Sequence, residues 1–217
     1  MALTNLFQCY LSQALALGMC RSCVKVEGKD SSATLQPFYT LQLDIQDQAV
    51  RSVTDALQAN FASEQLDGFI CDKSKQGVEA TRYLSLEELP PVLILHLKRF
   101  VYDGATGLVQ KIMKPVEFGM DLEIGKAVLS AECRAATTAR SRQYKLFSVV
   151  YHNGREATKG HYVTDVFHQG HSSWLHCDDS SVQPTAEELV VAPSSTSTPY
   201  ILFYRRGDTM VGTERAL

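Results

Sequence analysis

The sequence has few of the residues that mark several common classes of protein. Its 217 residues include one tryptophan and seven prolines. No apolar run reaches the roughly 18 residues that a membrane-spanning helix needs. Six cysteines are too few for the disulfide framework of a secreted domain of this size, so we expect reduced thiols and a location in the cytoplasm or nucleus. The composition also excludes disordered and collagen-like chains.

An excess of positive charge is lacking as well. The chain has 21 Lys and Arg against 24 Asp and Glu, for a formal net charge of −3. Its basic clusters are no longer than Lys98-Arg99 and Arg205-Arg206. Proteins that bind nucleic acids need positive charge to neutralise phosphates. We therefore expect neither nucleic acid nor membrane among the partners.

The apolar pattern predicts an α+β fold that is mostly antiparallel β. Residues 38–45 alternate and predict a half-buried strand, and Ser52 is placed to cap a helix that follows. Residues 92–97 form a continuous apolar run behind two prolines, which predicts a strand buried on both faces. Short strand-like segments dominate the second half of the chain, at residues 144–151, 162–167, 173–177 and 200–204.

One histidine and one aspartate could form a catalytic pair. His161 follows a glycine-bounded loop, and Asp178 ends a later strand-like segment, so the two could lie side by side on adjacent antiparallel strands. A carboxylate that accepts the imidazole Nδ1–H leaves Nε2 free to deprotonate a nucleophile. A purely structural hydrogen bond is the alternative interpretation of the same two residues.

Two cysteines have the spacing of half a zinc site. Cys20 and Cys23 form a C-x-x-C pair, which can supply two thiolates on one turn. The second pair is incomplete, because Cys71 is followed by Ser74 where another cysteine is expected, and a hydroxyl is a poor zinc ligand beside thiolates. A structural zinc is one prediction; a ribbon held together by packing is the other.

A sulfur nucleophile is harder to find. Cys9 precedes an apolar stretch compatible with a helix, and a helix N-terminus favours the thiolate. We favour the alternative, in which Cys9 is a small buried side chain on an amphipathic helix. Neither Cys133 nor Cys177 has a sequence context that suggests activation.

Several segments, in order and spacing, resemble the ubiquitin-specific proteases (peptidase C19). They are Leu89–Phe100 (LPPVLILHLKRF), Tyr144–Gly154, Gly160-His161-Tyr162, Trp174 and Asp178-Asp179. The similarity runs from about residue 20 to residue 206. It implies a papain-like cysteine protease fold with fingers, palm and thumb, which hydrolyses the isopeptide bond at the C-terminus of ubiquitin. Ubiquitin and ubiquitinated proteins would then be the partners, and no cofactor would be required.

The resemblance also implies roles for individual residues. His161 matches the general base, Asp178 the carboxylate that orients it, and Asp179 the acid beside it. Gly160 and Tyr162 match the channel that binds the Gly-Gly tail of ubiquitin.

In the fingers, Cys20, Cys23 and Cys71 match three of the family's four zinc-binding cysteines, with Ser74 in the place of the fourth. The family's nucleophilic cysteine box, by contrast, has no counterpart among the 19 residues before Cys20.

These similarities divide the chain into four expected parts: an atypical segment (1–19), degenerate zinc-ribbon fingers (near 20–85), a palm (86–206) and a tail (207–217). With the thumb missing, we expect a truncated deubiquitinase that is inactive alone. Two other functions stay open: a non-catalytic ubiquitin-binding module, and a zinc-ribbon interaction protein.

Overall fold

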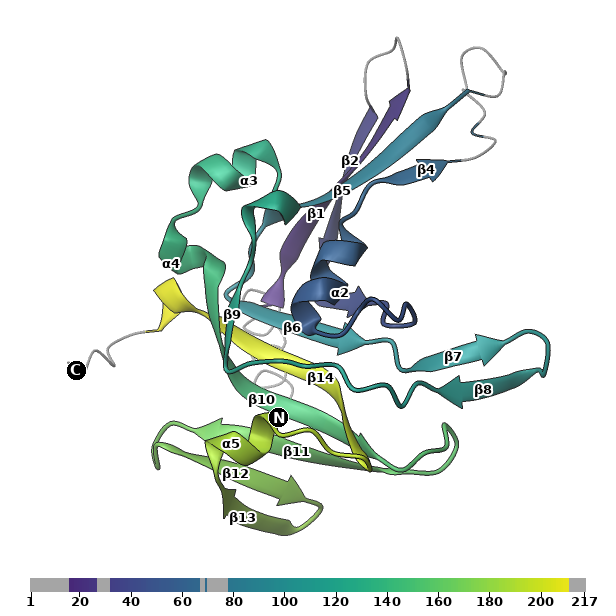
Figure 1. The fold of residues 1–217 in the computed structure, drawn as a ribbon. Helices are drawn as coiled ribbons and strands as arrows, with labels where there is room; N and C mark the ends of the chain where they lie inside the picture. The colour runs from purple at the N-terminus through teal and green to yellow at the C-terminus, as the bar shows by residue number, and fades with distance from the viewer. Residues whose placement is uncertain (1–15, 27–31, 67–68, 70–77, 211–217) are drawn as a thin grey trace, which may run out of the picture.

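The computed structural model describes residues 16–26, 32–66, 69 and 78–210, and its ribbon shows a narrow sheet that extends from a larger one (Figure 1). The narrow sheet has four antiparallel strands in the order β2-β1-β5-β4. Their bounds are β1 Gly18–Val26, β2 Ser32–Phe38, β4 Glu64–Leu66 and β5 Ala80–Glu88. The strand at one edge, β2, contains Pro37.

The larger sheet has eight strands and carries most of the core. Its order is β13-β12-β11-β10-β14-β6-β3, with β9 paired to β10, and β13 at one edge contains Pro184. All of its pairings are antiparallel except that of β3 with β6. The bounds are β3 Thr40–Leu43, β6 Val92–Leu97, β9 Asp121–Glu123, β10 Gln143–Asn153, β11 His161–His168, β12 Ser173–Asp178, β13 Ser181–Thr185 and β14 Ser197–Arg206. The α+β class and the dominance of antiparallel strands are confirmed.

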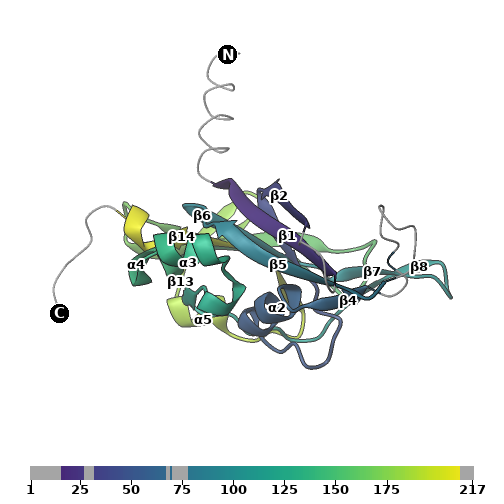
Figure 2. The same cartoon turned by 90° about the horizontal axis from the view of Figure 1, so that it is seen from above.

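A separate hairpin and several short helices complete the described part. The hairpin consists of β7 (Phe100–Asp103) and β8 (Leu108–Lys111). The helices are α2 (Val53–Asn60), α3 (Ala131–Ala136), α4 (Ala139–Arg142) and α5 (Glu187–Val191), with 3-10 turns η1 (Lys126–Val128) and η2 (Gly207–Thr209). Seen from above, α3 and α4 lie together (Figure 2). No helix in these ranges is long and apolar enough to cross a lipid bilayer.

The start of α2 confirms the predicted cap. The Ser52 side chain accepts a hydrogen bond from the backbone N–H of Asp55, and the Asp55 side chain accepts one from the backbone N–H of Ser52. This reciprocal pair satisfies two amide donors that a helix otherwise leaves free at its start.

Strand β6 differs from the prediction that it is buried on both faces. Leu93, Leu95 and Leu97 are fully buried, whereas Ile94 and His96 are partly exposed. The apolar run therefore has one face in the core of the sheet. The other face carries an aromatic cluster, in which Tyr200 packs against His96 with ring centroids 4.7 Å apart.

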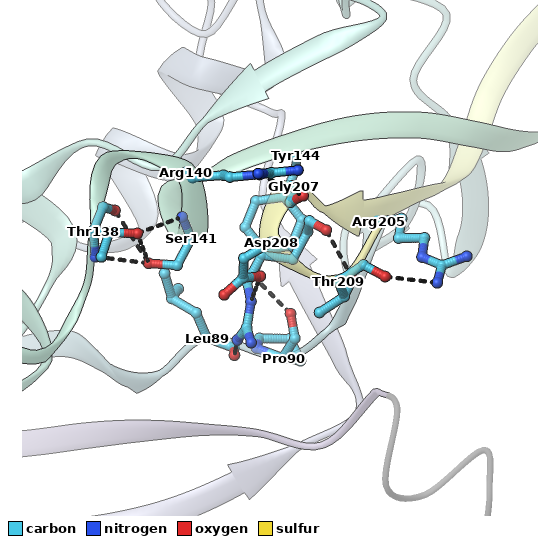
Figure 3. Close-up of polar contacts among 11 residues, drawn as sticks. Leu89, Pro90, Thr138, Arg140, Ser141, Tyr144, Arg205, Gly207, Asp208 and Thr209 are labelled. Carbon is cyan, nitrogen blue, oxygen red and sulfur yellow. Dashed lines mark hydrogen bonds and ion pairs between the residues drawn. The ribbon is translucent and has the colours of Figure 1, made fainter. Parts of the chain in front are cut away.

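Polar contacts fix the far end of β14 to the segment before β6 (Figure 3). Tyr144 Oη donates to the carbonyl of Pro90 at 2.7 Å, and Arg206 donates to the carbonyl of Leu89. Arg206 Nε also donates to Asp208 Oδ1 at 2.7 Å, while Arg140 donates to the carbonyl of Gly207. These bonds hold β6, β10 and β14 together at the end opposite His161.

Candidate active site

His161 and Asp178 are in direct contact. His161 begins β11 and Asp178 ends β12, and these two strands are antiparallel neighbours. His161 Nε2 lies 2.5 Å from Asp178 Oδ1. Both side chains are nearly half exposed, at 44% and 47%, so the imidazole is bound on one side and open on another.

The ring nitrogen that contacts the carboxylate is not the one expected from the sequence. We predicted that Nδ1 would face Asp178, but Nε2 faces it. When the imidazole is neutral, Nε2–H donates to Asp178 and the lone pair on Nδ1 is free. The prediction was wrong because the nitrogen that faces the carboxylate depends on the side-chain torsions of His161, which the residue types do not reveal. Either ring nitrogen of a neutral imidazole can carry the proton, so this arrangement still leaves one nitrogen able to accept a proton.

The surrounding charges favour the protonated imidazole. The pKa of His161 is raised, first by the hydrogen bond to Asp178 and then by the negative charges of Asp178 and Asp179. Asp179 lies in the turn after β12 in a left-handed conformation, with φ of 49°. Its carboxylate joins the other two groups in a cluster whose polar atoms all lie within 4.8 Å of one another. A divalent cation could use these same three atoms, but it would have to replace the existing hydrogen bond.

Gly160 and Tyr162 surround His161 in the chain but contact a different group. A Cβ atom added to Gly160 would lie 2.1 Å from His152 Nε2 and 2.6 Å from the Asn153 carbonyl oxygen. Side chains alternate along a strand, so Tyr162 faces away from the Asp178 side. Its ring packs against His152 and Tyr200 at centroid distances of 4.9 and 5.7 Å.

Sequence reasoning missed a second histidine–aspartate contact and a lysine on the same sheet and its neighbouring hairpin. His176 Nδ1 lies 2.6 Å from Asp165 Oδ1, and the nearly buried Asp165 shares its strand face with His161. Lys111, at the end of β8, donates to the carbonyls of His152 and Gly154. No motif marks these residues, because the Lys111 contacts join segments far apart in sequence and the His176–Asp165 contact depends on the register of β11 and β12.

The two described cysteines of the predicted zinc site lie in an extended strand. Cys20 and Cys23 both belong to β1, where residues three positions apart point to opposite faces of the sheet. Burial raises the pKa of the Cys20 thiol to about 11, which disfavours the thiolate that zinc requires. This geometry differs from the knuckle that the spacing predicts. Cys9, Cys71 and Ser74 lie outside the described residues.

The described fold brings a histidine and a carboxylate together at the ends of two adjacent strands of an α+β domain. The sequence profile of the ubiquitin carboxyl-terminal hydrolase family matches residues 1–204. The chain belongs to this family.

Curated proteins with similar sequences are named members of this family. The chain is 49% identical over 193 residues to ubiquitin carboxyl-terminal hydrolase 10 of Gallus gallus. The aligned region covers 89% of this chain and 24% of that protein. It is 39% identical over 201 residues to probable ubiquitin carboxyl-terminal hydrolase 3 of Schizosaccharomyces pombe, covering 87% and 38%. The chain thus spans about a quarter of the length of the first curated relatives. The motif Leu89–Phe100 and the His161 region correctly identified the family.

Solved structures show the same fold. A yeast SAGA DUB module matches with a TM-score of 0.76 at 27% identity, over 90% of this chain and 42% of that one. The SAGA Ubp8/Sgf11/Sus1/Sgf73 DUB module bound to ubiquitin aldehyde matches with a TM-score of 0.75 at 24% identity, over 94% and 47%. The predicted ubiquitin-specific protease fold is confirmed.

Proposed function

We propose that this chain is the palm and fingers of a thiol-dependent ubiquitin hydrolase, with His161 as general base and Asp178 as the group that orients it. The 2.5 Å contact between a half-exposed imidazole and a carboxylate carries this proposal. Because the curated relatives are named ubiquitin carboxyl-terminal hydrolases, ubiquitin is the proposed substrate. No cofactor takes part in the reaction, and the proposed location is the cytoplasm or nucleus.

The free Nδ1 of His161 would accept the proton of a cysteine thiol. The resulting thiolate attacks the carbonyl carbon of the last ubiquitin glycine, and the imidazolium then protonates the amine that leaves. Water, deprotonated by the same imidazole, hydrolyses the acyl-enzyme and returns the sulfur to its starting state. Asp178 and Asp179 stabilise the imidazolium, in agreement with the raised pKa of His161. Gly160 and Tyr162 would border the glycine tail of ubiquitin.

We infer that the sulfur comes from outside the described residues. Cys133 is buried in α3, and Cys177 points to the face of β12 opposite Asp178. Cys20 and Cys23 belong to β1 of the narrow four-stranded sheet. None of these four thiols faces Nδ1, and we interpret Cys9 as a non-catalytic side chain, so we propose that the chain alone does not hydrolyse ubiquitin conjugates.

The lack of a thiol that faces Nδ1 among the described cysteines favours a second candidate, a non-catalytic ubiquitin-binding module. Two assays on the 217-residue chain address both functions, a ubiquitin pull-down and hydrolysis of a fluorogenic ubiquitin C-terminal substrate, and the chimera described next separates the two. Binding without turnover is expected from both. Turnover that disappears on Cys9→Ala would instead identify Cys9 as the nucleophile and contradict the proposal that the chain alone is inactive.

A chimera tests the catalytic assignment. The segment that precedes the matched region in a ubiquitin carboxyl-terminal hydrolase 10 relative is joined before residue 20. We expect this chimera to hydrolyse the substrate, and His161→Ala to lower the rate by about a hundredfold or more, as for loss of a general base. His171→Ala, in the exposed turn after β11, is the matched control and should leave the rate unchanged. Full activity of the His161→Ala chimera would remove His161 from the mechanism and leave the binding module.

A further inference from the structure

The loop before His161 is held at its base by a lysine from a distant part of the chain. Lys111 Nζ donates to the carbonyl oxygen of His152 at 2.9 Å and to that of Gly154 at 2.6 Å. His152 lies near the end of β10, and Gly154 is the first residue after that strand. Lys111 itself ends β8, so the hairpin of β7 and β8 is tied to this loop.

The two ends of the loop touch each other at the place where Lys111 binds. Gly154 has φ of +106°, a conformation that favours glycine, and a Cβ atom there would lie 3.1 Å from the Lys159 carbonyl oxygen and 3.3 Å from Gly160 Cα. Gly160 in turn rests against the imidazole of His152. The backbone that Lys111 binds is therefore the surface on which the residue before His161 packs.

We propose that Lys111 is a positioning residue for His161. By binding two carbonyls at the base of the loop, its ammonium fixes Gly160, and with it the point at which His161 enters β11 beside Asp178. This inference rests on the proposed role of His161 as the base. Lys111 acts through the backbone and does not contact the reacting atoms.

The environment of the lysine supports a specific role. Burial and the positive charge of Arg99 lower the pKa of Lys111 to about 8. Within the described residues, no carboxylate forms an ion pair with Lys111, so the two carbonyls are its hydrogen-bond partners there. Hydrogen bonds from a charged donor to backbone carbonyls are stronger than those between neutral groups, and here they oppose the cost of burying the charge.

Lys114 provides a matched control. It lies three residues further along the chain, and its Nζ donates to the carbonyl of Asp47, which is remote from the loop. The variants Lys111→Met and Lys114→Met therefore remove the same group and the same kind of contact. Lys111→Arg keeps the charge and offers several donors, so it should keep the hydrogen bonds to the carbonyls of His152 and Gly154.

The test uses two measurements on the 217-residue chain: amide hydrogen exchange in residues 154–160 and the NMR titration of the His161 ring. We expect Lys111→Met to speed exchange in the loop by about tenfold or more, because both charge-assisted hydrogen bonds are lost. The pKa of His161 should also fall towards its ordinary value as the contact with Asp178 loosens. Lys111→Arg and Lys114→Met should behave like the wild type in both measurements.

Three results would overturn the proposal: unchanged exchange and titration in Lys111→Met, the same changes in Lys114→Met, or no recovery in Lys111→Arg. If Lys111→Met does not fold, Lys111→Gln replaces it, and the same outcomes decide. Neither measurement involves ubiquitin or turnover. The proposed function can therefore fail its own assays while this result stands.

Discussion

Gly160 fits against the ring of His152 so closely that a single methyl group would not fit between them. A Cβ atom at position 160 would lie 2.1 Å from Nε2 and 2.4 Å from Cε1 of that ring. His152 cannot easily move away, because it is 3% exposed and its ring meets the edge of Phe100 at 5.2 Å. This contact fixes the position of Gly160, the residue immediately before β11.

Gly160→Ala should therefore destabilise the protein by about 1 to 3 kcal/mol, the usual cost of overpacking a tight site. Gly104→Ala is the control, since a Cβ atom there has no neighbour within 4 Å. Urea unfolding measures both free energies. Equal stability of the two variants would show that His152 yields to the added methyl group.

Asp178→Asn should lower the pKa of His161, because the hydrogen bond to Asp178 is the largest cause of its elevation. Asp179→Asn should lower that pKa less, since Asp179 acts only through its charge. NMR titration of the ring measures both shifts. A larger fall in Asp179→Asn would reverse the roles of the two acids.

The same pair makes stability depend on pH. A histidine whose pKa is raised in the folded state stabilises that state most below its ordinary pKa of 6.5, and this contribution disappears as the pH rises through the folded value. The difference in unfolding free energy between the wild type and Asp178→Asn should thus be larger in mild acid than in mild base. A difference that grows with pH would contradict the sign.

Tyr144→Phe should cost about 1 to 3 kcal/mol, because it leaves the buried carbonyl of Pro90 without its donor. Tyr102, which is 71% exposed in the β7–β8 hairpin, serves as the control, and Tyr102→Phe should have little effect. Thermal unfolding of both variants compares them. Equal midpoints would mean that the Tyr144 hydroxyl contributes nothing to the junction in Figure 3.

Cys20 should react slowly with iodoacetamide in the folded protein. Burial raises the pKa of its thiol to about 11, so little thiolate is present near neutral pH. Mass spectrometry of the labelled peptide gives the rate, and the chain in urea is the reference in which the thiol is free of its surroundings. Equal rates in the folded and unfolded protein would contradict the burial of Cys20.

The sequence predicted those features that depend on local pattern. Leu41, Leu43 and Ile45 alternate with polar residues, and all three are buried in the structure. The helix after Ser52 begins where its cap indicated. The motif Leu89–Phe100 identified the family without any tertiary information, because its residues are contiguous.

Features that depend on contacts between distant segments were not predictable in this way. Which ring nitrogen of His161 meets Asp178 depends on the side-chain torsions that the surrounding strands allow. The contact of Lys111 with the loop depends on where the β7–β8 hairpin lies against β10. Likewise, the extended backbone at Cys20 results from pairing with β2 and β5, and a C-x-x-C spacing carries no information about those partners.

The prolines in two edge strands affect how readily the protein aggregates at high concentration. Pro37 in β2 and Pro184 in β13 each lack an amide hydrogen, so each border presents an interrupted row of donors. An interrupted row is a poor template for a strand from another molecule. The edges at β2 and β13 are thus protected against the edge-to-edge strand pairing between molecules that leads to fibres.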